Sequence, residues 1–323
     1  MPGRHWSLFT ALLATAGCSV LNIPSGPGLP VGPSLRTATH VVTLLATDEP
    51  HPPLLQPNQV QVVPRKVGLL LTPLDGSPAP SIIEIAREVP PSSDSNELRL
   101  IAVVGDQMWI QAGGVYVYDL RTRRLRSESN PPPEQQVRSF SDVVTSGWRV
   151  SETRWIGLYL PEDVEKGKLK PGSPVMPGIL PLRSVPYESI GLGLIPTRER
   201  RRLYSGEIDT TGPIPRFKQL EPMGDEEFSN GVLLTQPASK DGAWIAYEGR
   251  FPDLTLHVRR IDASGKALWT VDTRITREPQ LLPGGDLLVM RGVPQVPDGK
   301  FPQPILVLLN TLTGQISSSE LKW

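Results

Sequence analysis

The sequence predicts an all-β protein built from repeated antiparallel sheets, and two observations lead to this prediction. The 36 prolines and 29 glycines are spread between short apolar runs, which is the pattern of many turns joining many short strands. In addition, no segment after Cys18 has the long 3.6-residue apolar period that indicates a helix. The order of strands and turns recurs along the chain, so the period of that recurrence defines the fold class further.

The clearest repeating unit covers residues 106–125, where DQMWI, a Gly-Gly turn and VYVYDL lead into a third strand. The same order recurs at 241–269 and at 285–316. An Asp or Asn starts the last turn of each unit because its side chain accepts hydrogen bonds from the amides ahead. With three weaker copies, these turn-starting residues are Asp75, Asp119, Asp163, Asp209, Asp262 and Asn310.

These markers are separated by 44, 44, 46, 53 and 48 residues. A period of about 40 to 50 residues with three or four strands per unit is typical of a β-propeller. We therefore predict a propeller of about six blades over residues 37–323, with seven blades also compatible. A two-domain β protein is the alternative. The apolar run at 40–46 could supply a strand that closes the ring with the last blade.

The strand at 241–247 shows how such blades would pack. Strict alternation places Trp244 and Ala246 on one face and Ile245 and Tyr247 on the other, so both faces are apolar. A blade between two neighbours needs this composition. We therefore predict that Trp244 is buried between blades.

The first residues have the features of an export signal. A short positively charged start is followed by an apolar run at 6–16, which is shorter than the roughly 20 residues that span a bilayer. Small residues then lead into Cys18, the only cysteine in the chain. The stretch ATAGC resembles the lipobox of bacterial lipoproteins. This resemblance implies a signal peptide at 1–17 and lipid on Cys18, and Ser19 then implies sorting to the outer membrane.

The segment that follows the cysteine is predicted to be a tether. Prolines at 24, 27, 30 and 33 favour an extended chain over residues 18–36. The predicted domains are thus a signal peptide, this Pro/Gly-rich tether and a propeller. The formal net charge is zero, which does not favour nucleic acid as a partner.

The sequence contains two resemblances to known propellers. The stretch SKDGAWIAY with LHVRRID resembles the WD-like repeat of TolB-type periplasmic proteins, and PGGDLLV echoes the same turn. The stretch DASGKALW is similar to the repeat of quinoprotein-type propellers, including scaffold lipoproteins of outer-membrane assembly. Both resemblances imply a propeller, and neither implies a particular activity.

Few residues suggest chemistry. No His or Cys pair has metal-ligand spacing, and no Walker loop, dinucleotide fingerprint or Gly-x-Ser-x-Gly elbow occurs, so no catalytic residue, metal or cofactor is predicted. His257 is expected to be an ordinary strand residue. The acidic residues 225–227 and the pair Glu162 and Asp163 are interpreted as solvated charges, although paired carboxylates also serve glycoside chemistry. The arginines at 198 and 200–202 are interpreted as a solvated turn, with anionic lipid or an acidic partner as the alternative. The six mature tryptophans are expected to serve blade packing rather than a sugar site.

We interpret the chain as a non-enzymatic envelope lipoprotein, lipid-anchored in the membrane and facing the periplasm or the cell surface, whose propeller binds protein partners. The alternatives are a carbohydrate-active or lactone-type hydrolase with carboxylates at the propeller channel, and a glycan or small-molecule sensor.

Replacing Cys18 with Ser tests the predicted address. Acyl labelling and partitioning into detergent should both be lost, because the thiol is the acylated group and multiple acylation is what anchors such a protein stably. Labelling with a radioactive fatty acid measures the first, and phase separation measures the second, with the uncleaved precursor scored separately. A wild-type product that is cleaved normally but soluble would contradict lipidation.

Overall fold

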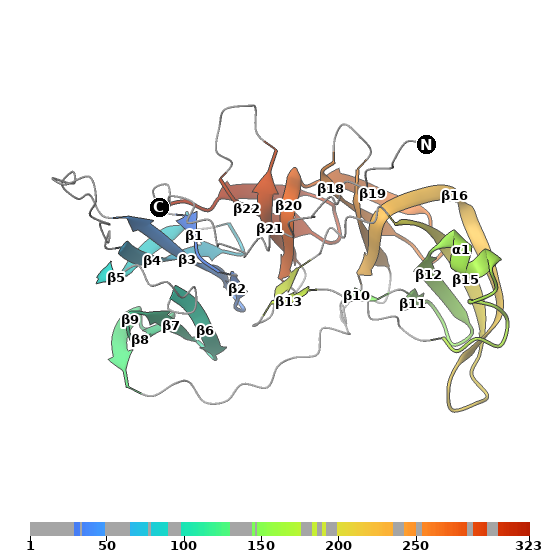
Figure 1. Cartoon of the computed structure of the whole chain (residues 1–323), viewed down its shortest axis with the longest axis horizontal. Helices are drawn as coiled ribbons and strands as arrows, with labels where there is room; N and C mark the ends of the chain where they lie inside the picture. The colour runs from blue at the N-terminus through green and yellow to red at the C-terminus, as the bar shows by residue number, and fades with distance from the viewer. Residues whose placement is uncertain are drawn as a thin grey trace, which may run out of the picture.

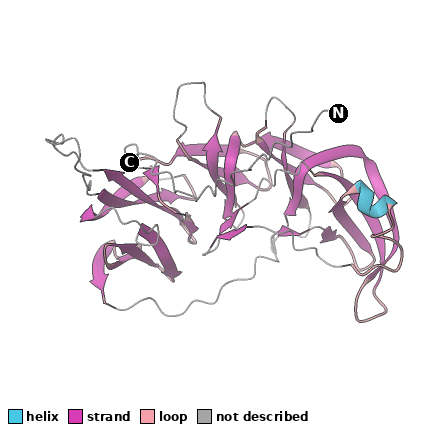
Figure 2. Ribbon diagram, viewed as in Figure 1, coloured by secondary structure: helices cyan, strands magenta, loops and turns pink. Residues whose placement is uncertain are grey.

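The computed structural model describes residues 29–32, 34–48, 65–76, 79–89, 98–129, 144–145, 147–175, 183–185, 189–191, 199–234, 242–249, 254–282, 287–295 and 303–323. Within these ranges the regular structure consists of β-strands in four antiparallel sheets and one short helix, as Figure 2 shows. The all-β prediction is therefore confirmed. The signal peptide, Cys18 and His51 lie outside the described residues.

The first unit is a sheet in which β3 pairs with β4 and β4 with β5, while β1 and β2 both pair with β3. Its strands are β1 (Leu29–Pro30), β2 (Leu35–Arg36), β3 (His40–Asp48), β4 (Arg65–Pro73) and β5 (Ser81–Val89). The tether predicted over residues 18–36 thus overlaps the folded domain from Leu29 onward. Proline at position 30 is compatible with β1 because that strand lies at the edge of its sheet.

The second unit is a four-stranded meander, with each strand paired to the next in sequence. Its strands are β6 (Leu98–Val104), β7 (Gln107–Ala112), β8 (Val115–Asp119) and β9 (Arg124–Glu128). It corresponds to the clearest repeat in the sequence. Two-residue and four-residue turns join its last three strands, which is the hairpin pattern that the glycines at 113 and 114 predict.

The third and fourth units share one sheet and one strand. The strands of this sheet are β11 (Gly147–Arg149), β12 (Arg154–Tyr159), β15 (Arg200–Asp209), β16 (Arg216–Leu234), β17 (Ala243–Glu248), β18 (Leu256–Ile261) and β19 (Ala267–Asp272), with β10 (Val144–Thr145) beside β16. The strand β16 pairs with β15 over residues 216–229 and with β17 over residues 229–234. Its first half therefore completes the third unit with β11, β12 and β15, and its second half begins the fourth unit with β17–β19. Helix α1 (Pro161–Glu165) follows β12.

The fifth unit is the C-terminal sheet, in which β20–β23 form a meander and β14 adds β13 to the other edge. Its strands are β13 (Arg183–Val185), β14 (Ser189–Gly191), β20 (Ile275–Leu282), β21 (Leu287–Pro294), β22 (Ile305–Asn310) and β23 (Ile316–Glu320).

The marker residues confirm the repeat at five positions. Each of five markers lies within the turn between the last two strands of a unit or is the strand residue that starts this turn: Asp75, Asp119, Asp209, Asp262 and Asn310. In four of these turns the side-chain oxygen accepts backbone N–H hydrogen bonds from two or three residues ahead, as predicted. The donors are Thr122 at 2.7 Å, Thr211 at 2.9 Å, Ser264 at 2.8 Å and Leu312 at 2.9 Å.

The prediction that the sixth marker, Asp163, starts a turn between strands was wrong. This residue lies in α1, and its carboxylate pairs with Lys168 at 2.6 Å. Proline at the first helical position, with two acidic residues in the first turn, accounts for the helix at this point. The described residues therefore hold five units, and they do not confirm the predicted six.

The units pack face to face in a continuous series. Separate apolar clusters join the second unit to the first, the first to the fifth, the fifth to the fourth, and the fourth to the third. Figure 1 shows this order from β6–β9 through β3–β5 and β20–β22 to β12 and β15. The first and last units of the chain are thus neighbours, which is the arrangement of the propeller class. The described residues form an all-β protein of that class.

The contact between the first and last units differs from the one we expected for residues 40–46. The strand β3 pairs only with strands of its own unit, and it meets the fifth unit through side chains such as Val41 and Leu45 against Val289 and Leu306. Both faces of this nine-residue strand are buried, so it lies inside the stack rather than at an edge where it could complete another sheet.

Two arginines hold the first and fifth units together. The Arg36 side chain is 8% exposed, and its Nη1 donates to the carbonyls of Leu287 at 2.7 Å and Leu282 at 3.3 Å. In the other direction, Nη1 of Arg291 donates to the carbonyl of Gly32 at 2.5 Å. Hydrogen bonds from a charged donor are stronger than neutral ones, so these contacts fix the position of one sheet against the other.

The prediction that Trp244 is buried between units is confirmed. Its side chain is 0% exposed and belongs to the cluster that joins the fourth unit to the fifth. Its Nε1 donates to the carbonyl of Thr311, 3.4 Å away in the β22–β23 turn. The indole therefore contributes both apolar area and one polar contact across the joint between units.

Replacing Trp244 with Ala should destabilise the protein by about 3 to 5 kcal/mol, because the lost transfer energy and the remaining cavity add. Since a domain is stable by roughly 5 to 15 kcal/mol, the melting temperature should fall visibly. A thermal melt followed by circular dichroism measures this. The matched control is Leu268→Ala in the same unit, which removes a side chain that is 49% exposed and should change little. An unchanged melt of the tryptophan variant would contradict its structural role.

Candidate functional site: a charged bulge in the shared strand

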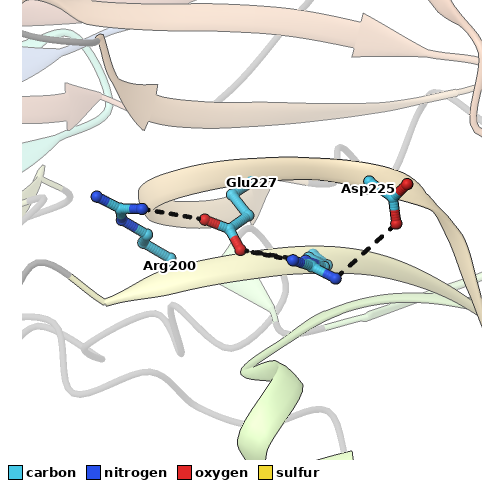
Figure 3. A network of polar contacts seen from close by, with 4 residues as sticks. Arg200, Asp225 and Glu227 are labelled. Carbon is cyan, nitrogen blue, oxygen red and sulfur yellow. Dashed lines mark hydrogen bonds and ion pairs between the residues drawn. The ribbon is translucent and has the colours of Figure 1, made fainter.

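The acidic and basic runs that the sequence presents separately lie side by side in the structure. The arginines 200–202 are at the start of β15, and the acidic residues 225–227 are in the middle of β16, where Glu227 lies directly opposite Arg202. Figure 3 shows Arg200, Glu227 and Asp225 in one network of polar contacts. Pairing along the two strands thus converts two runs of like charge into one network.

The network is centred on Glu227. Its carboxylate accepts hydrogen bonds from Arg202 Nη2 at 2.8 Å and Nε at 3.3 Å, and from Arg200 Nη1 at 3.4 Å. Asp225 is fully exposed and lies 4.0 Å from Arg202. The hydrogen bonds from Arg202, with a smaller contribution from Arg200, hold the pKa of the Glu227 carboxyl below its ordinary value. Glu227 therefore stays ionised and accepts hydrogen bonds.

A bulge in β16 puts these side chains in place. Between two register points β15 advances by two residues, from Arg202 to Tyr204, while β16 runs from Glu227 to Pro222. Residues 223–226 thus lie opposite the single residue Leu203, and Gly224 has a φ of 104° there, a conformation that favours glycine. Bulges of this kind redirect side chains and bend the strand that carries them.

The bulge also reaches the fourth unit. Glu226 Oε2 accepts a hydrogen bond at 2.6 Å from Arg259 Nη1 on β18, whose side chain is 17% exposed. The Met223 thioether lies so close to Gly265, in the β18–β19 turn, that a Cβ there would be 2.5 Å from Met223 Cε. The bulge therefore braces the two halves of the bent sheet against each other.

Arg259 is held on all sides. Its guanidinium carbon lies 5.2 Å from the Phe228 ring centroid and 5.5 Å from that of Tyr247, within the range of cation–π attraction. The ring of His257 stacks on Tyr247 at 5.5 Å, which confirms that this histidine is a half-buried strand residue. Burial acts to lower the pKa of Arg259, but the hydrogen bond that it donates to Glu226 and the contact with Tyr247 raise the pKa overall.

A polar cavity lies on β12, β15 and β16, and sequence reasoning did not find it. It has a volume of about 280 Å³ and is lined by Thr153, Arg154, Ser205, Gly206, Glu207, Gln219 and Glu221. Cross-strand pairing aligns Arg154, Glu207 and Gln219 in one row. No short motif marks this site, because its residues come from three separate strands.

The remaining candidates serve structure. Glu162 pairs with Lys166 at 2.8 Å and lies in α1 with Asp163. The tryptophans 109, 148, 155 and 244 are buried in strands, in four different apolar clusters. Trp155 and Tyr159 lie over Gly147 and Gly157, where a Cβ would clash with each ring. The expectation that these tryptophans pack the sheets is confirmed.

The described ranges show neither a metal site nor a membrane-spanning helix. They contain no group of three or more His, Cys, Asp and Glu side chains that could hold a metal ion. They also contain no helix that is long and apolar enough to cross a membrane.

Comparison with known proteins adds little. No family model and no curated protein matches the chain. Among solved structures, the acylaminoacyl peptidase of Pyrococcus horikoshii is 12% identical with a TM-score of 0.24, and the match covers 89% of this chain and 39% of the peptidase. The β-propeller domain of the Trilobed protease from Pyrococcus furiosus is 8% identical with a TM-score of 0.23, and the match covers 92% and 96% of the two chains. Likeness at this level carries no argument about the activity of this chain.

Replacing Glu227 with Gln should destabilise the protein more at pH 6 than at pH 3. Because the folded-state pKa of Glu227 is lowered, its contribution to stability is present above the unfolded-state pKa and is lost as the pH falls through the folded-state value. Melting temperatures of wild type and variant at both pH values measure the difference. Arg202→Gln should also lower the melting temperature less at pH 3 than at pH 6. The double variant should be little less stable than either single variant, because the two side chains act through one interaction. A gap that is equal at both pH values would show that Glu227 acts through packing alone.

Proposed function

We propose that this chain is an envelope lipoprotein, exported and acylated at Cys18, whose stacked sheets form a non-enzymatic binding scaffold for a protein partner. The observation that supports the scaffold is that its charged and aromatic side chains contact one another or pack the sheets. The carboxylates of Glu226 and Glu227 pair with arginines instead of with each other. The tryptophans in the strands join or cover sheets.

The carboxylate arrangement favours the scaffold over the hydrolase. A pair of catalytic carboxyl groups must flank one bond, and one of them must be protonated to act as the acid. Glu226 and Glu227 instead each pair with a different arginine, Arg259 for the first and Arg202 for the second. The arginine contacts also keep the pKa of Glu227 low, which is the opposite of what a general acid needs.

One observation favours the sensor as a second candidate. The cavity beside Arg154 combines a guanidinium, two carboxylates, an amide and hydroxyls, which are the groups that bind sugar hydroxyls or a small zwitterion. In a sensor, this cavity would bind the ligand and the sheets would hold its lining residues in place.

Crosslinking of the full-length protein in its native membrane tests the scaffold. We expect a defined protein partner to remain bound in detergent and to crosslink to the propeller. The matched variant is Cys18→Ser, which should release the protein from the membrane but retain the partner in solution, because the anchor and the binding surface are separate. The scaffold is overturned if no protein crosslinks, or if a sugar or lactone is hydrolysed. A sugar that raises the melting temperature of the wild type, but not of Arg154→Ala, would make the sensor the better candidate.

A further inference from the structure

The last strands of the five units, here called the outer strands, differ in how readily a further strand could pair with them. They are β5, β9, β16, β19 and β23. An edge strand has a row of unpaired N–H and C=O groups, and proteins usually block such edges with charges, bulges or proline. In the second unit β9 carries Arg124, Arg126 and Glu128. The pairing of β5 has two register shifts, that of β19 has one, and β16 continues into the next unit. These edges are blocked.

The last strand, β23, has fewer of these devices, with one charged residue at its end. It pairs with β22 in a regular register over all five residues, and its sequence ISSSE has no charge before Glu320 and no proline. It is the final strand in its sheet, and four of its five side chains are exposed. Among the outer strands that the structure describes, β23 is thus the most open to strand addition.

The hydrogen-bond pattern shows which groups point outward. Asn310 N donates to Gln315 O, and Leu321 N donates to Pro304 O, so the odd-numbered residues of this strand bond to β22. Since hydrogen bonding alternates along an antiparallel pair, the N–H and C=O groups of Ile316, Ser318 and Glu320 point away from β22. Six backbone groups are thus aligned for a further strand.

We propose that β23 is a docking edge to which an extended segment of a protein partner adds as an antiparallel strand. This inference rests on the proposed scaffold function and names the form of the partner. Main-chain hydrogen bonds would supply affinity, and side chains opposite β23 would supply specificity.

The side chains of β23 define the partner sequence. Ile316 is 38% exposed, and Leu312 beside it in the turn is 64% exposed, so an apolar residue fits opposite Ile316. The serine at 318 favours a small hydroxyl residue opposite it, because Ser and Thr side chains hydrogen-bond to each other across neighbouring strands. Glu320 pairs with Lys322 in an exposed ion pair that a basic residue of the partner can replace. The partner strand therefore reads basic-x-small-x-apolar from its N-terminus.

A second copy of this chain fits less well. Antiparallel pairing of two β23 strands about Ser318 places Glu320 of each copy opposite Ile316 of the other. A carboxylate beside an exposed isoleucine gains no ion pair, so the edge is more complementary to a basic and apolar segment.

Selection from a random heptapeptide display library against the full-length protein in detergent tests the proposal. Peptides with the basic-x-small-x-apolar pattern should be enriched. A selected peptide, once synthesised, should slow amide hydrogen exchange at Ile316, Ser318 and Glu320.

Two substitutions at Ser318 provide the matched pair. Ser318→Pro removes only an outward-pointing donor and should weaken the selected peptide at least tenfold, because proline is tolerated at an edge but blocks pairing there. Ser318→Thr keeps the donor and should bind as the wild type does. If the proline variant loses its fold in a thermal melt, Ser318→Lys replaces it, since an exposed charge also blocks an edge.

The proposal is overturned if no peptide is enriched, if the Pro and Thr variants bind a selected peptide equally, or if the protein dimerises through β23. Continued crosslinking of a partner together with any of these results would leave the scaffold standing and remove only β23. Loss of both peptide binding at β23 and crosslinking of a partner would contradict the scaffold function as well.

Discussion

The rest of the structure depends on the fact that each internal sheet is apolar on both faces. The strand β17 shows this directly, because Trp244 and Ala246 face the fifth unit while Ala243 and Ile245 face the third. A sheet of this kind cannot expose either face to water without losing about 25 cal/mol for each Å² of apolar surface. Stacking is therefore imposed by composition, and the order of the units follows from which sheet covers which face.

Charged residues fix the relative position of the stacked sheets, which apolar packing alone does not determine. Stacked apolar faces resist separation but slide with little cost, whereas hydrogen bonds are directional. Arg36 and Arg291 supply that direction between the first and fifth units, and Glu226 with Arg259 supplies it between the third and fourth. The protein thus uses buried or half-buried guanidinium groups at the joints between sheets.

Local features could be predicted from the sequence, and features set by pairing could not. The turns at Asp119, Asp209, Asp262 and Asn310 were predictable because the side chain and the amides that it binds are within a few residues of each other. Asp163 was not, because proline at position 161 favours a helix. The network of Arg202 and Glu227 joins residues 25 positions apart, and its register depends on a bulge. Only Gly224, inside a long strand, could have signalled that bulge.

The shared strand β16 has a consequence for how the protein folds. In an ordinary repeat array each unit completes its own ladder, and stability is a sum of separate units and their contacts. Here nineteen consecutive residues belong to two units, so the third cannot lose its last strand without pulling on the first strand of the fourth. The two units form one cooperative block. The other joints have side-chain contacts and no shared strand, so opening of the stack costs less there than between the third and fourth units.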